Sequence, residues 1–274
     1  MYQILKKQKL NPFVTLMEVK AKDVAKNAKP GQFIILRVDE KGERIPLTIA
    51  DTDIERESVT IIYQIVGLTT KKLDKLNEGD YLLDFVGPLG KPTDISLLKD
   101  VLVIGGGVGS AICLPVVKAL KLQGSKVDVI LGFRSMDLVI LEDEFLKYSN
   151  NLLIVTNDGS YGKKGLVTDY LSLYLDKKKY DQVFTVGPLI MMKSVCEITK
   201  KYGQKTIVSM NPIMIDGTGM CGGCRITVGN EFKFACVDGP DFDGHLVDFD
   251  EAIYRNKMYQ EIEREKDCRL LKNE

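Results

Sequence analysis

VLVIGGGVGSA, residues 101–111, has the pattern of a buried strand that runs into a glycine-rich turn and the start of a helix. Four apolar residues, typical of a buried strand, lead directly into Gly105, Gly106, Gly107, Val108 and Gly109. The residues that follow, SAICLPVVKALKLQG, have the pattern of a helix that ends at Gly124. A glycine turn between a strand and a helix lets backbone N–H groups and the helix dipole hold a pyrophosphate. The stretch therefore predicts a strand–turn–helix unit with a candidate nucleotide site at its turn.

This turn departs from the standard dinucleotide-binding fingerprint. Ser110 stands where the third glycine belongs, and Gly132, Phe133 and Arg134 stand where an acid for the ribose is expected. A tight turn without a ligand is the alternative interpretation. Arg134 suits either a 2′-phosphate or a surface ion pair, so the motif does not choose between NAD and NADP.

The region around the turn alternates strands with helices from Lys99 to the strand KTIVSMN, residues 205–211. Such alternation predicts a doubly wound parallel sheet, and we assign it residues 98–211. Asp158-Gly159 and Gly187-Pro188 follow later strands of this series. Ligands of open α/β sheets bind at the carboxyl ends of strands, so these residues extend the candidate nucleotide site.

The flanking regions have other patterns. Residues 1–97 contain short strands separated by turns, which predicts a small antiparallel β barrel. Residues 212–250 form a small module rich in glycine and cysteine, and residues 251–274 a charged helix. In that helix Ile253, Tyr254, Met258 and Ile262 recur at near-helical spacing, which favours packing on its own domain over contact with a partner.

Composition excludes several classes of protein. The chain has 274 residues, and its 38 Lys and Arg balance 38 Asp and Glu, so nothing predicts a nucleic acid or an anionic membrane as partner. A single His argues against chemistry built on several imidazoles. The longest uncharged run, Val101–Val117, contains the glycine turn and is shorter than the ~20 residues of a membrane span. With no secretory signal, we expect a cytoplasmic protein without disulfides.

Three of the six cysteines lie close together, in MIDGTGMCGGCRITVGNEFKFACVDGP. Their spacing is Asp216-x4-Cys221-x2-Cys224-x11-Cys236. Plant-type [2Fe–2S] proteins use Cys-x4-Cys-x2-Cys with a distant fourth cysteine, and here Asp216 takes the first place. Glycines in such a loop let backbone N–H groups approach the cluster. The spacing favours a [2Fe–2S] cluster.

A structural zinc site is the main alternative, with His245 completing a set of three cysteines and one histidine. The second Cys-x2-Cys of a zinc ribbon is missing, which favours iron–sulfur. For Asp216 the alternative role is a turn or a helix cap, because carboxylate is a harder ligand than thiolate. The scattered cysteines are interpreted as buried or incidental thiols. They are Cys113, Cys196 and Cys268.

Two segments of the barrel region offer phosphate contacts. In GERIPLTIAD, Arg44 is a fixed cation suited to a diphosphate. The next residues present backbone and a hydroxyl to a flat ring, and they are Ile45, Pro46, Leu47 and Thr48. In YQIVGLTTKKL, Gly67 precedes Thr69 and Thr70 in a possible second phosphate turn, for which an ordinary strand-to-helix cap is the alternative.

Taken together and in this order, these motifs resemble the ferredoxin-reductase-like flavoproteins throughout the chain. The likeness is strongest to two small subunits: the electron-transfer subunit of dihydroorotate dehydrogenase, and the small subunit of NADH-dependent reduced ferredoxin:NADP oxidoreductase, also described as a sulfide dehydrogenase subunit. The cluster motif of the first has four cysteines. Asp216 in the first place favours the second, whose cluster has one Asp and three Cys ligands.

The resemblance implies three cofactor sites. FAD is held by Arg44, Ile45, Pro46, Leu47 and Thr48, with Val66, Gly67, Thr69 and Thr70 at its phosphates. NAD(H) is lined by Gly105, Gly106, Gly107, Val108, Gly109, Asp158, Gly159, Gly187 and Pro188. A [2Fe–2S] cluster is held by Asp216, Cys221, Cys224 and Cys236. It also implies a larger partner with a second FAD and [4Fe–4S] clusters.

The expected activity is electron transfer between NAD(H), FAD and the cluster, to or from that partner, in a bifurcating complex. Hydride transfer between nicotinamide and flavin needs positioning more than acid–base residues, so no catalytic residue is assigned. One alternative is the dihydroorotate dehydrogenase subunit. An alternative of another class is a zinc-containing module that senses a nucleotide, which leaves the Arg44–Thr48 segment without a role.

Overall fold

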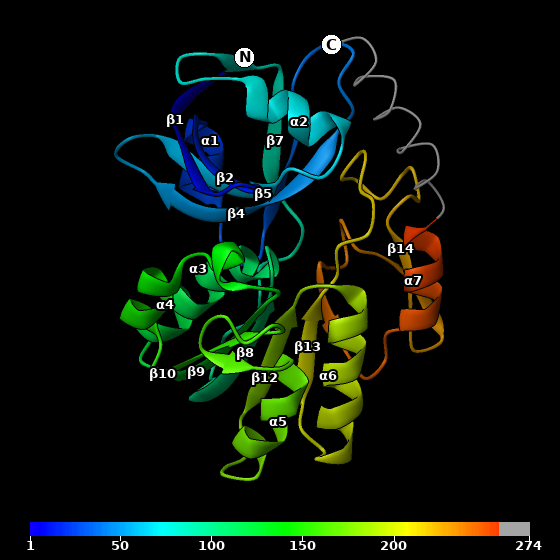
Figure 1. The fold of residues 1–274 in the computed structure, drawn as a ribbon. Helices are drawn as coiled ribbons and strands as arrows, with labels where there is room; N and C mark the ends of the chain where they lie inside the picture. Colours follow the sequence, from blue (N-terminus) through cyan, green and yellow to red (C-terminus); the bar gives the residue numbers. More distant parts are fainter. Residues whose placement is uncertain (258–274) are drawn as a thin grey trace.

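The computed structural model describes residues 1–257, which form three sheets and the helices packed on them. Figure 1 shows a barrel-like sheet at the top, a second sheet with helices below it, and smaller elements beside both. No helix in the described part of the chain is long and apolar enough to cross a membrane. The uncharged run Val101–Val117 is instead divided between a strand and a helix.

The first sheet is antiparallel throughout and nearly closed, in the strand order β6-β1-β2-β5-β4-β3-β7. Its interior is filled by side chains that alternate inward along the strands, such as Met17, Ile34 and Ile61, none of which is exposed. The strands are β1 (Tyr2–Asn11), β2 (Val14–Lys20), β3 (Phe33–Arg37), β4 (Ile45–Asp53), β5 (Ser58–Gln64), β6 (Tyr81–Leu82) and β7 (Asp84–Leu89), with helices α1 (Lys22–Asn27) and α2 (Leu68–Lys75). The predicted antiparallel barrel is confirmed.

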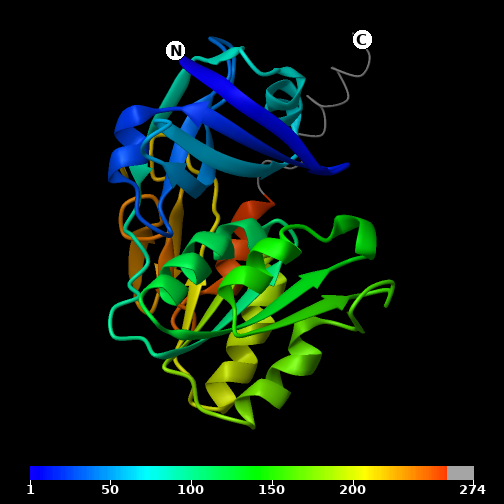
Figure 2. The same ribbon diagram turned by 90° about the vertical axis from the view of Figure 1, so that its left-hand side faces the viewer.

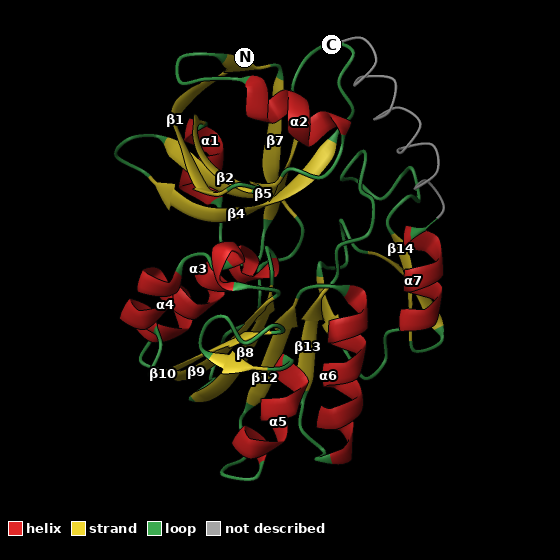
Figure 3. Cartoon of the chain, viewed as in Figure 1, coloured by secondary structure: helices red, strands yellow, loops and turns green. Residues whose placement is uncertain are grey.

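The second sheet has the order β11-β10-β9-β8-β12-β13-β16, and all its neighbours are parallel except β13 and β16. Its strands are β8 (Asp100–Gly106), β9 (Lys126–Phe133), β10 (Asn151–Thr156), β11 (Lys163–Lys164), β12 (Gln182–Val186), β13 (Thr206–Ser209) and β16 (Asp241–Asp243). Its helices are α3 (Gly109–Leu122), η1 (Met136–Leu138), α4 (Glu142–Tyr148), α5 (Val167–Leu175) and α6 (Leu189–Lys201). Figures 2 and 3 show helices on both faces, so the predicted doubly wound sheet is confirmed.

Helix α3 joins the two sheets. Its buried residues Ala111 and Leu114 belong to one apolar cluster with Val14, Ala50 and Ile62 of the barrel. At the rim of this contact the Lys118 ammonium lies 2.7 Å from a carboxylate oxygen of Asp51. Because the helix that follows the glycine turn packs on the barrel, the turn is held beneath the barrel (Figure 2).

The cysteine-rich region forms a hairpin of β14 (Arg225–Val228) and β15 (Glu231–Phe234), followed by β16 and helix α7 (Phe249–Asn256). Asp248 caps α7 by accepting a hydrogen bond from the Glu251 N–H. The helix therefore begins at Phe249, two residues before the start at residue 251 that the sequence predicted. Of the expected helical stripe, Ile253 and Tyr254 lie in α7, whereas Met258 and Ile262 lie outside the described residues.

A set of hydrogen bonds, here called the seam, connects this cysteine-rich region to both larger sheets. The N–H of Lys91, in the connection after the barrel, donates to the Gly239 carbonyl at 2.6 Å, and the Thr93 hydroxyl donates to Asp241 at 2.5 Å. Strand β16, which contains Asp241, pairs with β13 of the second sheet. Burial raises the pKa of Asp241 to about 6. The cysteine-rich region is thus fixed against both the barrel and the sheet.

A buried polar network closes the amino-terminal edge of the second sheet, and it yields a stability prediction. Asp128 is only 4% exposed and accepts hydrogen bonds from Asn151 and from the Tyr180 hydroxyl, both at 2.7 Å, while the Lys178 ammonium lies 3.2 Å away. Burial acts to raise the pKa of Asp128, but these three donors outweigh it and lower that pKa. We expect Asp128→Ala to reduce the free energy of unfolding by about 3 kcal/mol, because the donors lose their acceptor.

Urea unfolding at pH 7 measures this difference, and Asp100→Ala is the control, since Asp100 pairs with the same lysine at a half-exposed site. That control is expected to cost under ~1 kcal/mol. Because the folded pKa of Asp128 is lowered, its contribution is complete above the unfolded pKa of ~4 and is lost as the pH falls through the folded value. Equal losses in the two variants would contradict the prediction.

Candidate functional site

The glycine turn after β8 is brought against the end of β12. The Gly107 N–H donates to the Gly132 carbonyl at 2.8 Å, with Gly107 at a φ of +56°. A Cβ added to Gly109 would lie 2.6 Å from the Val186 carbonyl oxygen, and one added to Gly187 would lie 3.1 Å from the Gly106 Cα. Only glycines allow this approach of two backbones. The structure therefore brings the Gly105–Gly109 turn and Gly187-Pro188 together at the carboxyl edge of neighbouring strands.

Asp158 and Gly159 lie on the same edge but further along it. They follow β10, which is separated from β8 by β9. The exposed Asp158 carboxylate accepts hydrogen bonds from the Ser160 N–H at 2.9 Å and the Ser160 hydroxyl at 2.7 Å, which lower its pKa. One oxygen of Asp158 is thus used within its own turn, which lies two strands away from the glycine turn.

The barrel segment Ile45–Thr48 opens β4 and has one unpaired edge. It pairs with β3 from Ile45 to Thr48, whereas the ladder between β4 and β5 begins only at Ile49. Pro46, which has no N–H, is compatible with such an edge. The backbone groups along the open side can therefore meet a cofactor, and exposed Arg44 precedes them directly.

The segment Val66–Thr70 caps helix α2. The Thr70 hydroxyl accepts hydrogen bonds from the N–H groups of Val66 and Gly67, both at 3.0 Å, while Thr69 is buried. The Thr70 side chain thus caps the helix, which is the role that the sequence analysis gave as the alternative to a phosphate-binding turn. A Cβ on Gly67 would meet no atom within 4 Å, so the start of α2 faces open space. Because β4 and β5 are antiparallel, this helix start and the Ile45–Thr48 edge lie toward the same end of the barrel.

The cysteine loop brings two of its three thiols together. The Cys224 and Cys236 sulfurs lie 3.2 Å apart as free, buried thiols, and the Cys236 N–H donates to the Cys224 sulfur at 3.5 Å. Burial, together with the neighbouring Cys224 thiol, raises the pKa of Cys236 to about 12. A metal or cluster that binds there has to displace these protons.

The other two predicted ligands, Cys221 and Asp216, make contacts within the loop itself. The Cys221 thiol is exposed and accepts a long 3.5 Å contact from the Gly223 N–H. The two carboxylate oxygens of Asp216 accept hydrogen bonds from the Thr218 and Cys221 N–H groups, at 2.8 and 2.7 Å, which lower its pKa. Within residues 1–257, no three His, Cys, Asp or Glu side chains are grouped to hold one metal ion. A cluster bound by all four residues therefore requires the four side chains to lie closer together than they do here.

The loop nevertheless suits an iron–sulfur cluster, both in the side chains that it offers and in the course of its backbone. It offers two converging thiols, a third one nearby, and backbone N–H groups that already contact sulfur. Gly217, at a φ of +77°, passes so close to the barrel that a Cβ would lie 2.7 Å from Leu89. The histidine of the zinc alternative is occupied elsewhere, since a ring nitrogen of His245 lies 3.0 Å from the Thr199 hydroxyl.

Sequence reasoning missed two arginines beside this loop. Arg225 and Arg255 line a cavity between β14, α7 and the end of β13, and Arg255 donates to the Gly223 carbonyl at 3.4 Å. Arg255 lies in a charged helix with no motif around it, so nothing in the sequence could place it at the cysteines.

Comparison with known proteins agrees with this arrangement. Residues 211–248 match the iron–sulfur cluster binding domain of dihydroorotate dehydrogenase B. The chain is 47% identical over 270 residues to a dihydroorotate dehydrogenase B (NAD(+)) electron transfer subunit homolog of Thermotoga maritima, covering 98% of this chain and 95% of that one. It is 33% identical over 234 residues to the corresponding electron transfer subunit of Fusobacterium nucleatum, covering 82% and 88%. A chain in the structure of NADH-dependent reduced ferredoxin-NADP oxidoreductase superposes with a TM-score of 0.93 at 45% identity, covering 99% and 98%.

A barrel above a doubly wound sheet, with an iron–sulfur domain at their seam, defines a ferredoxin-reductase-like electron-transfer protein that uses FAD, NAD(H) and an iron–sulfur centre. Within that class, the chain belongs to the family of dihydroorotate dehydrogenase B electron-transfer subunits and their homologues. Members of this family are subunits, so the chain works as part of a larger complex. The predictions of fold class, family, redox activity and cofactors are thereby confirmed.

Proposed function

We propose that this chain is the small subunit of a bifurcating ferredoxin:NADP oxidoreductase (transhydrogenase) complex in the cytoplasm, and that its larger partner carries FAD and [4Fe–4S] clusters. The observation that carries the proposal is the pair of buried thiols, Cys224 and Cys236, on a loop seated at the seam between barrel and sheet. The full-length likeness to a chain of NADH-dependent reduced ferredoxin-NADP oxidoreductase supports this partner.

In this proposal the chain divides into residues 1–97 for FAD, 98–211 for NAD(H), and a cluster region from residue 212 that is followed by α7, which begins at Phe249. The unpaired edge of β4 offers Ile45–Thr48 to the flavin ring, and Arg44 offers a cation to its diphosphate. Val66, Gly67, Thr69 and Thr70 surround the start of α2 beside the FAD phosphates. The N–H groups of Val66 and Gly67 already donate to the Thr70 hydroxyl, so the N–H groups that follow them at the helix start are the ones offered to phosphate.

The nucleotide site lies at the carboxyl edge of the second sheet. At the starts of α3 and α6, a pyrophosphate can approach the backbone of the turn Gly105–Gly109 and of Gly187-Pro188. The helix dipoles favour its negative charge there. Asp158-Gly159 bounds the site two strands away. When bound, the flavin exchanges a hydride with nicotinamide and single electrons with the cluster. The chain's own contribution is to place the two nucleotides against each other, which no acid–base residue has to assist.

Two substitutions distinguish the two possible roles of Asp216, as a cluster ligand or as a residue that stabilises the turn. Asp216→Asn keeps an oxygen that can accept from one of the two N–H groups but removes the carboxylate, whereas Asp216→Cys supplies a thiolate and removes the turn contacts. If Asp216 is a ligand, we expect Asp216→Asn to lose most of its iron and Asp216→Cys to keep its cluster with a changed absorption spectrum. FAD stays bound in both.

Iron content and absorption spectra of the two purified variants measure this prediction. The opposite pattern, with a normal cluster in Asp216→Asn and an empty site in Asp216→Cys, would show that Asp216 serves only the turn.

A second candidate is the electron-transfer subunit of dihydroorotate dehydrogenase itself, favoured by the names of the curated relatives. Co-purification separates the two, since the first candidate copurifies with a subunit that contains [4Fe–4S] clusters and the second with a dihydroorotate-oxidising subunit.

The proposal is tested by an anaerobic absorption spectrum of the purified chain, with assays of iron, zinc and acid-labile sulfide. We expect flavin bands and about two irons and two sulfides per chain. Colourless protein with one zinc would overturn the electron-transfer function and leave the nucleotide-sensing alternative.

A further inference from the structure

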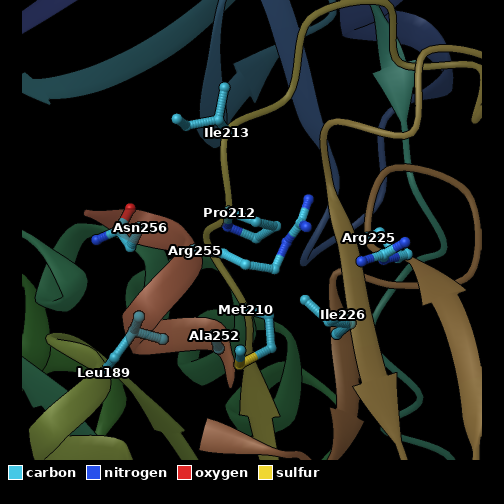
Figure 4. A pocket seen from close by; sticks show the side chains of 9 residues that line it. All are labelled: Leu189, Met210, Pro212, Ile213, Arg225, Ile226, Ala252, Arg255 and Asn256. Carbon is cyan, nitrogen blue, oxygen red and sulfur yellow. The ribbon is translucent and has the colours of Figure 1, made fainter. Parts of the chain in front are cut away.

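A small cavity lies directly behind the cysteine loop, on the side away from the barrel. It is lined by Leu189, Met210, Pro212, Ile213, Arg225, Ile226, Ala252, Arg255 and Asn256. Its volume of about 30 Å³ admits a water molecule but no nucleotide. Figure 4 shows the Arg255 side chain extending from α7 into this space. The cavity is therefore too small for a nucleotide, and Arg225 and Arg255 both form part of its wall.

The two arginines of the cavity differ in how their charges are balanced. Arg225 lies 3.8 Å from the Glu251 carboxylate, and its guanidinium carbon lies 4.7 Å from the centre of the Phe232 ring. Arg255 has no carboxylate within ion-pair distance among residues 1–257, and its contact is the Gly223 carbonyl at 3.4 Å. The charge of Arg255 is thus directed at the backbone of the loop.

Gly223 connects that charge to the cysteines. Its N–H contacts the Cys221 sulfur at 3.5 Å, and its carbonyl belongs to the peptide that continues into Cys224. A Cβ on Gly223 would lie 3.6 Å from the Cys221 sulfur. Arg255 is therefore one peptide group away from two of the predicted cluster ligands.

Helix α7 gives Arg255 a fixed position. The helix is capped by Asp248 and buries Phe249 and Ala252 against the apolar cluster that also contains Cys224 and Cys236. An arginine three residues after Ala252 projects from nearly the same face. The backbone of Arg255 is therefore fixed beside the loop, and the hydrogen bond to the Gly223 carbonyl places its guanidinium there.

We propose that Arg255 is a positioning residue for the iron–sulfur cluster: it holds the Cys221–Cys224 turn through the Gly223 carbonyl and raises the reduction potential of the cluster by its charge. Reduction adds one negative charge to the cluster, and a nearby fixed cation stabilises the reduced form. The guanidinium, because it is planar and always charged, holds this contact at every physiological pH. The inference rests on the proposed function, since it requires the cluster.

The test is a redox titration of the purified full-length protein followed by EPR of the reduced cluster, on the wild type and three variants. Arg255→Gln removes the charge and keeps a donor. Arg255→Lys keeps the charge without the planar fork. Lys257→Gln removes an equal charge two positions further along, at an exposed residue on another side of the helix. Iron, sulfide and flavin are measured in every sample.

We expect Arg255→Gln to keep its iron and to lower the midpoint potential, shifting the electron-exchange equilibrium five- to tenfold, where tenfold is 59 mV for one electron. Arg255→Lys should fall between Arg255→Gln and the wild type, and Lys257→Gln should equal the wild type. If Arg255→Gln takes up too little iron to titrate, Arg255→Lys decides, because a wild-type midpoint there overturns the contact with Gly223.

Two further outcomes would overturn the inference. One is an unchanged potential in Arg255→Gln with normal iron content. The other is an equal shift in Lys257→Gln, which would indicate a general charge effect. Wild-type protein without iron and sulfide is a different result, because it overturns the proposed function and not the placement of Arg255.

Discussion

Replacing Cys224 by serine is expected to empty the protein of iron and acid-labile sulfide while FAD stays bound. Cys224 is 1% exposed and its sulfur lies 3.2 Å from that of Cys236, so the substitution removes half of the thiol pair. A serine hydroxyl is a harder ligand with a much higher pKa, and it does not replace a thiolate on iron. The segments proposed to bind FAD are on other elements and are untouched by the substitution. Iron, sulfide and extracted flavin are measured on the same sample.

The functional result of Cys224→Ser is a separation of two reactions. Reduction of FAD by NADH should continue at the wild-type rate, and electron delivery to the partner should fall by more than 100-fold, because the cluster is the exit. The control is Cys113→Ala, a buried thiol in α3 that contacts the Ile104 carbonyl and lies outside the cysteine loop. It should retain both reactions. If NADH no longer reduced FAD in Cys224→Ser, the proposed order of carriers would be wrong.

The second large effect is expected from Gly109→Ala in the glycine turn. The new Cβ would lie 2.6 Å from the Val186 carbonyl oxygen and 3.0 Å from the Gly187 Cα, so the end of β12 has to move away from the start of α3. Both parts of the proposed NAD(H) site are displaced by this movement. We expect a loss of about 1–3 kcal/mol in stability and a roughly 100-fold slower reduction of FAD by NADH.

Stopped-flow measurement of flavin reduction checks the rate, and Gly124→Ala is the matched control. Gly124 ends the same helix at a φ of +95°, and a Cβ there meets no atom within 4 Å. The Gly124→Ala control should lose about 1 kcal/mol of stability, because alanine is strained at this positive φ. Its rate of FAD reduction by NADH should be unchanged. A normal rate in Gly109→Ala would place the nicotinamide nucleotide elsewhere on the chain.

The architecture could be predicted from sequence because each region repeats a local pattern. Alternating strands and helices between Lys99 and residue 211 allow one arrangement, a parallel sheet with helices on both faces, and the structure has it. The exceptions are the two short edge strands, β11 and β16, and β16 is three residues long and 30 residues beyond the end of that pattern. The pairing of β16 with β13 depends on hydrogen bonds between residues far apart in the sequence. A strand of three residues is too short to show a periodic pattern.

The site was predictable in its residue types but not in its side-chain directions. Spacing identified Cys224 and Cys236, which meet because the hairpin β14–β15 returns the chain to its start. Spacing offered a helix cap at Gly67–Thr70 and a turn role for Asp216 as alternatives, but it could not decide that Thr70 caps α2 with its hydroxyl or that Asp216 uses its oxygens within its own turn. Short polar side chains have local backbone partners available in any turn, and those partners compete with a cofactor.

The late position of β16 in the chain has a consequence for biosynthesis. The second sheet is complete up to β13 when residue 209 has been made, but the strand that covers its edge ends only at residue 243. During translation the cysteine-rich region must therefore emerge before that edge is protected. An exposed strand edge is a template for association with another chain. A nascent or truncated chain that stops before Asp241 is thus expected to aggregate, even though every element proposed to bind a nucleotide is already present in it.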